Sequence, residues 1–244
     1  MKILRFFFIS LVALSIFSCK KDEEGSLTIH FKAIYDGLPL AMFGTKPFTS
    51  PQQLQFSHLS LFISNLALVD QSSTEELRDI ELVDLSFDDV NSADMGYTVH
   101  FDQIPAKTYT GIQFGVGVPP DLNAKSPSEF PSSSPLSKTS YYWEAWHSYI
   151  FMKTEGHLDS LGTGAFDTGF AFHTGTDELY LLEQGPFPIN IEDGKDKVIE
   201  ILLDYKDVLA GIDIKSNPQN HNPQDSVQIK QLVENLGHSF SLVQ

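Results

Sequence analysis

The chain has 244 residues and a formal net charge of −16, from 32 acidic and 16 basic side chains, and it contains one cysteine. This acidity argues against nucleic acid as a partner, because phosphate binding requires clustered Lys and Arg. A single cysteine cannot form an intramolecular disulfide. A hydrophobic core must therefore stabilise the fold, and the chain is long enough to bury one of ordinary size.

Residues 1–18 have the pattern of a secretory signal peptide. Two basic residues precede an apolar run over 6–17, which is too short to cross a bilayer because a spanning helix needs about 20 residues. Cys19 follows at once, and the sequence Ile-Phe-Ser-Cys over 16–19 resembles a bacterial lipobox. This resemblance implies that Cys19 becomes the lipid anchor of the mature protein. A free thiol is the alternative.

Residues 19–25 are expected to form a lipid-anchored acidic tether. Lys-Lys-Asp-Glu-Glu at 20–24 is similar to the acidic export signal that follows the lipid cysteine in surface lipoproteins of the Bacteroidetes. We therefore expect a protein that is lipid-anchored in the outer membrane and faces outward from the cell surface. Loss of Lys2 and Arg5 with the signal changes the net charge from −16 to −18. The uniform composition of 26–244 predicts a single domain.

Alternation with a period of two dominates the mature chain and predicts strands. A half-buried strand is expected over 27–35, with His30 on its solvent face. The long apolar segment 54–69 changes phase near Ser64 and Asn65, which indicates a bulge. Further strands are expected over 80–85, 97–101, 109–118, 166–173, 179–183 and 197–203. This number of strands favours an all-β fold, an antiparallel β-sandwich.

A long Pro/Ser-rich loop follows the strand over 109–118. Gly111, Gly115 and Gly117 leave one face of that strand bare, so we expect a close neighbour there. Residues 119–140 contain five prolines and seven serines, and loops of this length in compact domains are often functional. We interpret this loop as a cover over a site, because it leads directly into the most aromatic segment of the chain. A mobile surface excursion is the alternative.

A short C-terminal helix is predicted from apolar residues at i, i+3, i+4 and i+7, namely Ile229, Leu232, Val233 and Leu236. Asp225 or Ser226 is the expected cap and Gly237 the stop. A last strand over 239–243 would then close the sheet.

Both tryptophans of the chain, Trp143 and Trp146, lie within residues 141–157 together with three tyrosines, His147 and His157. Imidazole suits copper, zinc, nickel and iron, and the indole and phenol rings are oxidisable, so the segment points to a metal or redox site. The alternative is that the aromatic side chains belong to the core and that His147 is a hydrogen-bonded neighbour.

A metal site would require histidines from separate strands, and His147, His157 and His173 are the best candidates. If 149–156 and 166–173 form a hairpin, His147 and His173 lie at one end and His157 near the turn. All three then meet only where the strands curve or a loop folds back. The sequence has no phosphate-binding glycine loop, nucleophile elbow or His-Glu-x-x-His pair, so we expect a binding protein and not an enzyme.

The order of several segments resembles the MbnP family. These segments are Ile-Ser-Asn-Leu-Ala-Leu at 63–68, Gly-Ile-Gln-Phe-Gly-Val at 111–116, Pro-Leu at 135–136, the aromatic run 142–156 and Phe-His-Thr-Gly at 172–175. The resemblance implies an exported protein in which histidines hold copper beside a tryptophan, and a partner dihaem peroxidase of the MbnH type oxidises that tryptophan to kynurenine. It assigns the modifiable ring to Trp143 or Trp146, and the copper ligands to His147, His157 or His173.

Two positions depart from the family pattern. Ser134 stands before the Pro-Leu pair where members often have a histidine, and Ser148 stands where they have a glycine. His147 stands where other members tend to have a polar residue such as Gln or Asn, so it is either a substitute ligand or a local change. The main alternative function is a non-metal surface module in which exposed aromatic side chains stack on a glycan or a protein. A purely structural lipoprotein is a further alternative.

Overall fold

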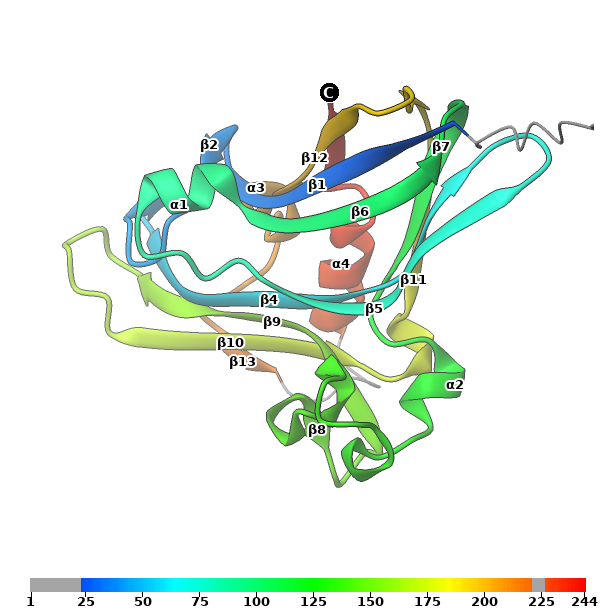
Figure 1. Ribbon diagram of the computed structural model, residues 1–244. Helices are drawn as coiled ribbons and strands as arrows, with labels where there is room; N and C mark the ends of the chain where they lie inside the picture. The colour runs from blue at the N-terminus through cyan, green and yellow to red at the C-terminus, as the bar shows by residue number, and fades with distance from the viewer. Residues whose placement is uncertain (1–22, 221–226) are drawn as a thin grey trace, which may run out of the picture.

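The computed structural model describes residues 23–220 and 227–244 (Figure 1). The predicted signal peptide, Cys19 and the predicted helix caps Asp225 and Ser226 lie outside the described residues. In the described part of the chain, no helix is long and apolar enough to cross a membrane.

The smaller of two sheets has five strands in the described residues. Its path is β14 (Phe240–Val243), β12 (Asp196–Asp204), β1 (Glu24–Tyr35) and β2 (Leu38–Pro39), and β6 (Tyr97–Pro105) also pairs with β1. Every second residue of β1 is buried, as the alternation predicts. The pairing of β1 with β12 is parallel, with Leu27 opposite Lys197.

The larger sheet has nine strands among the residues that the structure describes. Its path is β11 (Leu181–Asn190), β7 (Thr108–Val116), β4 (Gln53–Val69), β9 (Ser148–Asp159), β10 (Thr168–Gly175) and β13 (Gln219–Asn220). Three further strands join it, β3 (Lys46–Pro47) and β5 (Thr74–Asp84) on β4, and β8 (Tyr142–Trp143) on β9. The two sheets form two layers, which confirms the predicted all-β, mostly antiparallel sandwich (Figure 1).

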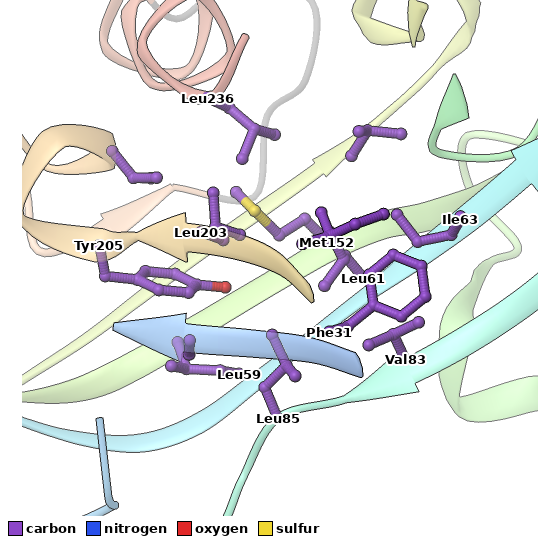
Figure 2. Packing of buried hydrophobic residues seen from close by; sticks show 14 of the residues in the cluster. Phe31, Leu59, Leu61, Ile63, Val83, Leu85, Met152, Leu203, Tyr205 and Leu236 are labelled. Atoms are coloured by element: carbon purple, nitrogen blue, oxygen red, sulfur yellow. The ribbon is translucent and has the colours of Figure 1, made fainter. Parts of the chain in front are cut away.

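The core lies between the layers. Phe31 of β1 and Leu203 of β12 face Leu61 of β4 and Met152 of β9, and all four side chains are buried (Figure 2). Helix α4 (Val227–Leu236) adds Leu236 from the side (Figure 2). The four apolar residues that predicted this C-terminal helix are all buried, and β14 then pairs with β12 as expected.

Two local features of the large sheet also agree with the sequence. In β4, Asn65 has a φ of 48°, and the register with β7 shifts between Ser64 and Ala67, so the predicted bulge is confirmed. In β7, a Cβ at Gly115 would lie 2.0 Å from the hydroxyl of Tyr180. Tyr180 is the close neighbour that the bare glycine face predicts.

The remaining helices are short. They are α1 (Val90–Met95), α2 (Pro120–Asn123) and α3 (Tyr205–Val208), with single 3-10 turns η1 (Pro127–Glu129), η2 (Pro135–Ser137), η3 (Thr139–Tyr141) and η4 (Asp177–Leu179). Helix α2 and the first three 3-10 turns lie in the Pro/Ser-rich loop. The loop is therefore folded onto the large sheet, near β8 at the bottom of Figure 1.

Candidate ligand-binding site

The Pro/Ser-rich loop covers one end of the outer face of the large sheet. Its residues Leu136 and Tyr141 join a second apolar cluster with Phe62 of β4 and Tyr149 of β9. Phe62 packs edge-to-face on both tyrosine rings, and the Tyr149 hydroxyl donates to the carbonyl of Leu136 at 2.8 Å. The tyrosines at 141 and 149 are thus core residues, as the structural alternative predicts, whereas the tryptophans lie further out.

Trp143 lies beside His173. Because β9 and β10 pair with Lys153 opposite His173 and Glu155 opposite Ala171, Glu155 and His173 are diagonal neighbours on the outer face. His173 Nε2 lies 2.7 Å from Glu155 Oε1, and its ring centroid lies 6.3 Å from that of Trp143, with the ring planes at 33°. Only 12% of the His173 side chain is exposed. This arrangement supplies one imidazole next to one indole.

A second histidine, His58, lies on the same face of the sheet. It stands opposite Glu155 in the β4–β9 pairing, and its Nε2 lies 2.9 Å from Ser60 Oγ and 3.3 Å from the Tyr141 hydroxyl. Lys153 lies on the same face, with its Nζ 4.1 Å from the centroid of the Tyr141 ring. Burial lowers the pKa of the Lys153 ammonium, and the charge of Glu155 opposes that effect.

The sequence did not predict His58 as a residue of this site. The alternation with Leu59 places His58 on the outer face, but no local sequence pattern predicts the register that puts His58 of β4 opposite Glu155 of β9.

His157 lies on the same outer face but far from His173. It stands opposite Gly169, four residues along β9 from Lys153, the partner of His173. At about 3.3 Å per residue, these levels of the sheet are about 13 Å apart. The side chain of His157 is exposed. His157 and His173 are therefore at opposite ends of the hairpin, as the sequence predicts, and the strands do not bring them together.

Trp146 and His147 lie in the turn between β8 and β9, where Trp143 pairs with Ser148. Both residues line a pocket of about 200 Å³, here called the Trp146 pocket, and 40% of Trp146 is exposed. The other lining residues come from α2, the start of β9 and the segment that enters η4: Asn123, Ala124, Ser148, Thr176, Asp177 and Glu178.

A buried hydrogen-bond network builds the wall of the Trp146 pocket. Asn123 Nδ2 donates to Asp177 Oδ1 at 2.8 Å, and Asn123 Oδ1 accepts from the backbone N–H of Tyr149 at 2.8 Å. Ser148 Oγ accepts from the backbone N–H of Thr176 at 2.9 Å. Asn123 and Ser148 are both buried. The network joins α2, β9 and η4, so hydrogen bonds within the protein define the shape of the pocket.

The family model of MbnP matches residues 24–225. This chain belongs to the MbnP family. The solved structure of MbnP from Methylosinus trichosporium is similar to it with a TM-score of 0.61 and 13% sequence identity, and the match covers 90% of this chain and 98% of that chain. At 13% sequence identity, the similarity between the two structures shows that they share a fold. No curated protein sequence matches the chain.

The arrangement of this MbnP-family chain does not fit a three-histidine copper site. His173 lies beside Trp143, and His147 lines the separate Trp146 pocket. His157 lies at the far end of the β9–β10 hairpin. Over residues 23–220 and 227–244, no group of three or more His, Cys, Asp or Glu side chains is arranged to hold a metal ion. Copper favours several N or S donors, and here one imidazole meets one indole.

Proposed function

We propose that this MbnP-family protein is a lipid-anchored surface module that binds a non-metal ligand at the Trp146 pocket. The observation that carries the proposal is the exposure of Trp146 at a pocket whose other lining residues, apart from Ala124, are polar. Binding sites commonly combine an aromatic side chain with a few fixed polar groups, because the ring supplies contact area and the polar groups supply orientation. Export and the lipid on Cys19 would place the pocket outside the cell.

Backbone strain at the pocket supports the same assignment. His147 has a φ of 48° and Thr176 a φ of 73°, and both residues line the Trp146 pocket. A positive φ is especially unfavourable for a β-branched residue such as Thr, and such conformations cost about 1–3 kcal/mol each. The rest of the fold must offset that cost. Strained residues of this kind cluster at functional sites, and here two meet at one pocket.

The test is a binding screen of residues 20–244, the chain without its signal peptide and Cys19, against glycans and outer-surface proteins. A specific ligand lost in Trp146→Ala supports the proposal. Phe43→Ala is the matched control, because Phe43 is also exposed but lies between β2 and β3 in the chain and does not line the pocket. Equal loss in both variants, or binding that Trp146→Ala leaves unchanged, would contradict the proposal.

A second candidate function is copper binding, which membership of the MbnP family and the contact of His173 with Trp143 favour. It would make His173 a ligand beside a modifiable tryptophan, with Glu155 orienting the imidazole through its other N–H. Loading with Cu(I) and with Cu(II), removal of excess ion and metal analysis test it. Stoichiometric copper that is lost in His173→Ala and retained in His157→Ala supports this candidate, whereas copper at background level rejects it.

The intact mass of protein from its native host addresses the oxidation of Trp143 or Trp146. A kynurenine at either position would support the copper candidate and a dihaem peroxidase partner of the MbnH type. Unmodified tryptophans, together with a ligand that depends on Trp146, would support the non-metal module.

A further inference from the structure

The Trp146 pocket carries negative charge. Its lining includes the carboxylates of Asp177 and Glu178, and none of its described lining residues is Lys or Arg. The chain as a whole has a net charge of −16, and one cation, Lys230 of α4, lies close enough to Glu178 to help lower the pKa of that carboxyl. A ligand with a phosphate or carboxylate group would be repelled here, and a cation would be attracted.

Both carboxylates are held by hydrogen bonds. Asp177 Oδ1 accepts from the buried Asn123 amide at 2.8 Å. A hydrogen bond from its own backbone N–H is the main cause that lowers the pKa of Glu178. Glu178 therefore stays ionised to a lower pH than an ordinary glutamate. Both residues begin η4 and line the pocket.

A buried polar group in the pocket wall is left without a regular hydrogen bond. Thr176 is only 7% exposed, and its Oγ1 has no hydrogen-bond partner of acceptable geometry in the described residues. The hydroxyl lies close enough to Glu178 to contribute to the lowered pKa of that carboxyl, behind the effect of the backbone N–H. A buried hydroxyl without a partner of regular geometry is unfavourable, so a ligand donor that reaches Thr176 Oγ1 would improve its hydrogen bonding.

The kind of cation follows from the donor set. The pocket has one imidazole and two carboxylates on its rim, but no group of described side chains is arranged to hold a metal ion. What it does offer a cation is an exposed indole. Trp is the best aromatic partner for an organic cation, because its electron-rich ring face attracts a cation that lies over it.

We propose that the Trp146 pocket binds the ammonium group of an organic ligand, with Trp146 contacting the cation and Asp177 and Glu178 supplying the opposing charge. This inference rests on the proposed function for the location of the site and adds the chemical class of the ligand. A neutral sugar would use the indole but would gain little from two carboxylates.

The experiment is calorimetric titration of residues 20–244 with choline and with butylammonium. The control ligand is 3,3-dimethylbutan-1-ol, the neutral counterpart of choline with the same shape. We expect at least one ammonium probe to bind, the neutral alcohol to bind at least tenfold more weakly, and Trp146→Ala and Glu178→Gln each to weaken the ammonium probe at least tenfold. Thermal unfolding of each variant checks that it is folded.

Three outcomes would overturn this inference. They are no binding of either ammonium probe, equal binding of the neutral alcohol, and displacement of the probe by Ca²⁺ at millimolar concentration as effectively as by a second ammonium compound. If the ammonium probes fail while a neutral ligand still depends on Trp146, only the ligand class is wrong. If no ligand of any class depends on Trp146, the proposed function fails as well.

Discussion

His173 and Glu155, on neighbouring antiparallel strands, form a hydrogen-bonded pair of 2.7 Å that lies beside the ring of Trp143. The pair links β9 to β10 on the outer face of the large sheet, where the Pro/Ser-rich loop ends. Glu155 also stands opposite His58 of β4. The carboxylate of β9 thus holds an imidazole of β10 whose ring lies beside the Trp143 ring.

Replacing His173 by Ala is expected to destabilise the fold. The variant loses the hydrogen bond to Glu155 and the packing against Trp143, and a hydrogen bond to a charged group contributes about 1.5–3 kcal/mol. Glu155 is one-third exposed and regains water, so we expect the free energy of unfolding in urea to fall by about 1–2 kcal/mol. The control is His157→Ala on the same face, where the side chain is exposed and a change below about 0.5 kcal/mol is expected. Equal losses in the two variants would contradict this view of the pair.

A methyl group at Gly115 is expected to disturb the centre of the large sheet. The added Cβ would lie 2.0 Å from the Tyr180 hydroxyl and 2.5 Å from Ser64 Oγ, so Tyr180 must move and give up its contacts with Ser64 and Asn65. Overpacking of this kind costs about 1–3 kcal/mol, which urea unfolding of Gly115→Ala would measure. Gly185→Ala on the neighbouring strand β11 is the control, since nothing lies within 4 Å of the Cβ there. A stable Gly115→Ala variant would show that Tyr180 has room to move.

Local sequence patterns predicted most of the elements but not their relative placement. The alternation in β1, the phase change at Asn65 and the spacing that ends at Leu236 each depend on near neighbours in the chain, and each is confirmed. The parallel pairing of β1 with β12 was missed, because it joins segments about 170 residues apart and leaves no local signal.

The candidate site was predicted in part for the same reason. The sequence placed His147 and His173 at one end of a hairpin and His157 at the other, and the β9–β10 register agrees. It did not predict that Trp143 faces His173 while Trp146 faces a separate pocket, because that division depends on how the turn before β9 folds. Nor did it predict that Asn123 builds the pocket wall, because its hydrogen bonds reach residues 25 and 54 positions away. Single polar residues inside an irregular loop carry no periodic signal.

Asp159 is expected to make stability depend on acid pH. Burial tends to raise the pKa of this carboxyl, but hydrogen bonds from the backbone N–H groups of the turn at 161–164 outweigh that effect and lower it. Because the pKa is lower in the folded state than the usual value of about 3.9, the stabilisation is present above about pH 4 and is lost as the pH falls further. We expect the free energy of unfolding to fall less steeply below pH 4 in Asp159→Asn than in the wild type. Parallel curves for the two proteins would show that another carboxylate dominates acid unfolding.

Substitution of His147, whose backbone is strained, can distinguish a role in the turn from direct contact of its imidazole with the ligand. Its φ of 48° suits glycine, and the side chain is exposed, so little packing is lost on replacement. We expect the free energy of unfolding of His147→Gly to equal that of the wild type or to exceed it by up to about 1 kcal/mol. For His147→Val we expect it to be lower than that of the wild type by at least about 1 kcal/mol, because a β-branched residue tolerates this conformation poorly. Binding at the Trp146 pocket should survive in His147→Gly, because Trp146, Asp177 and Glu178 supply the contacts that the proposal uses. If His147→Gly is stable but loses the ligand, the imidazole itself takes part in recognition, and the strain at this position is maintained for function.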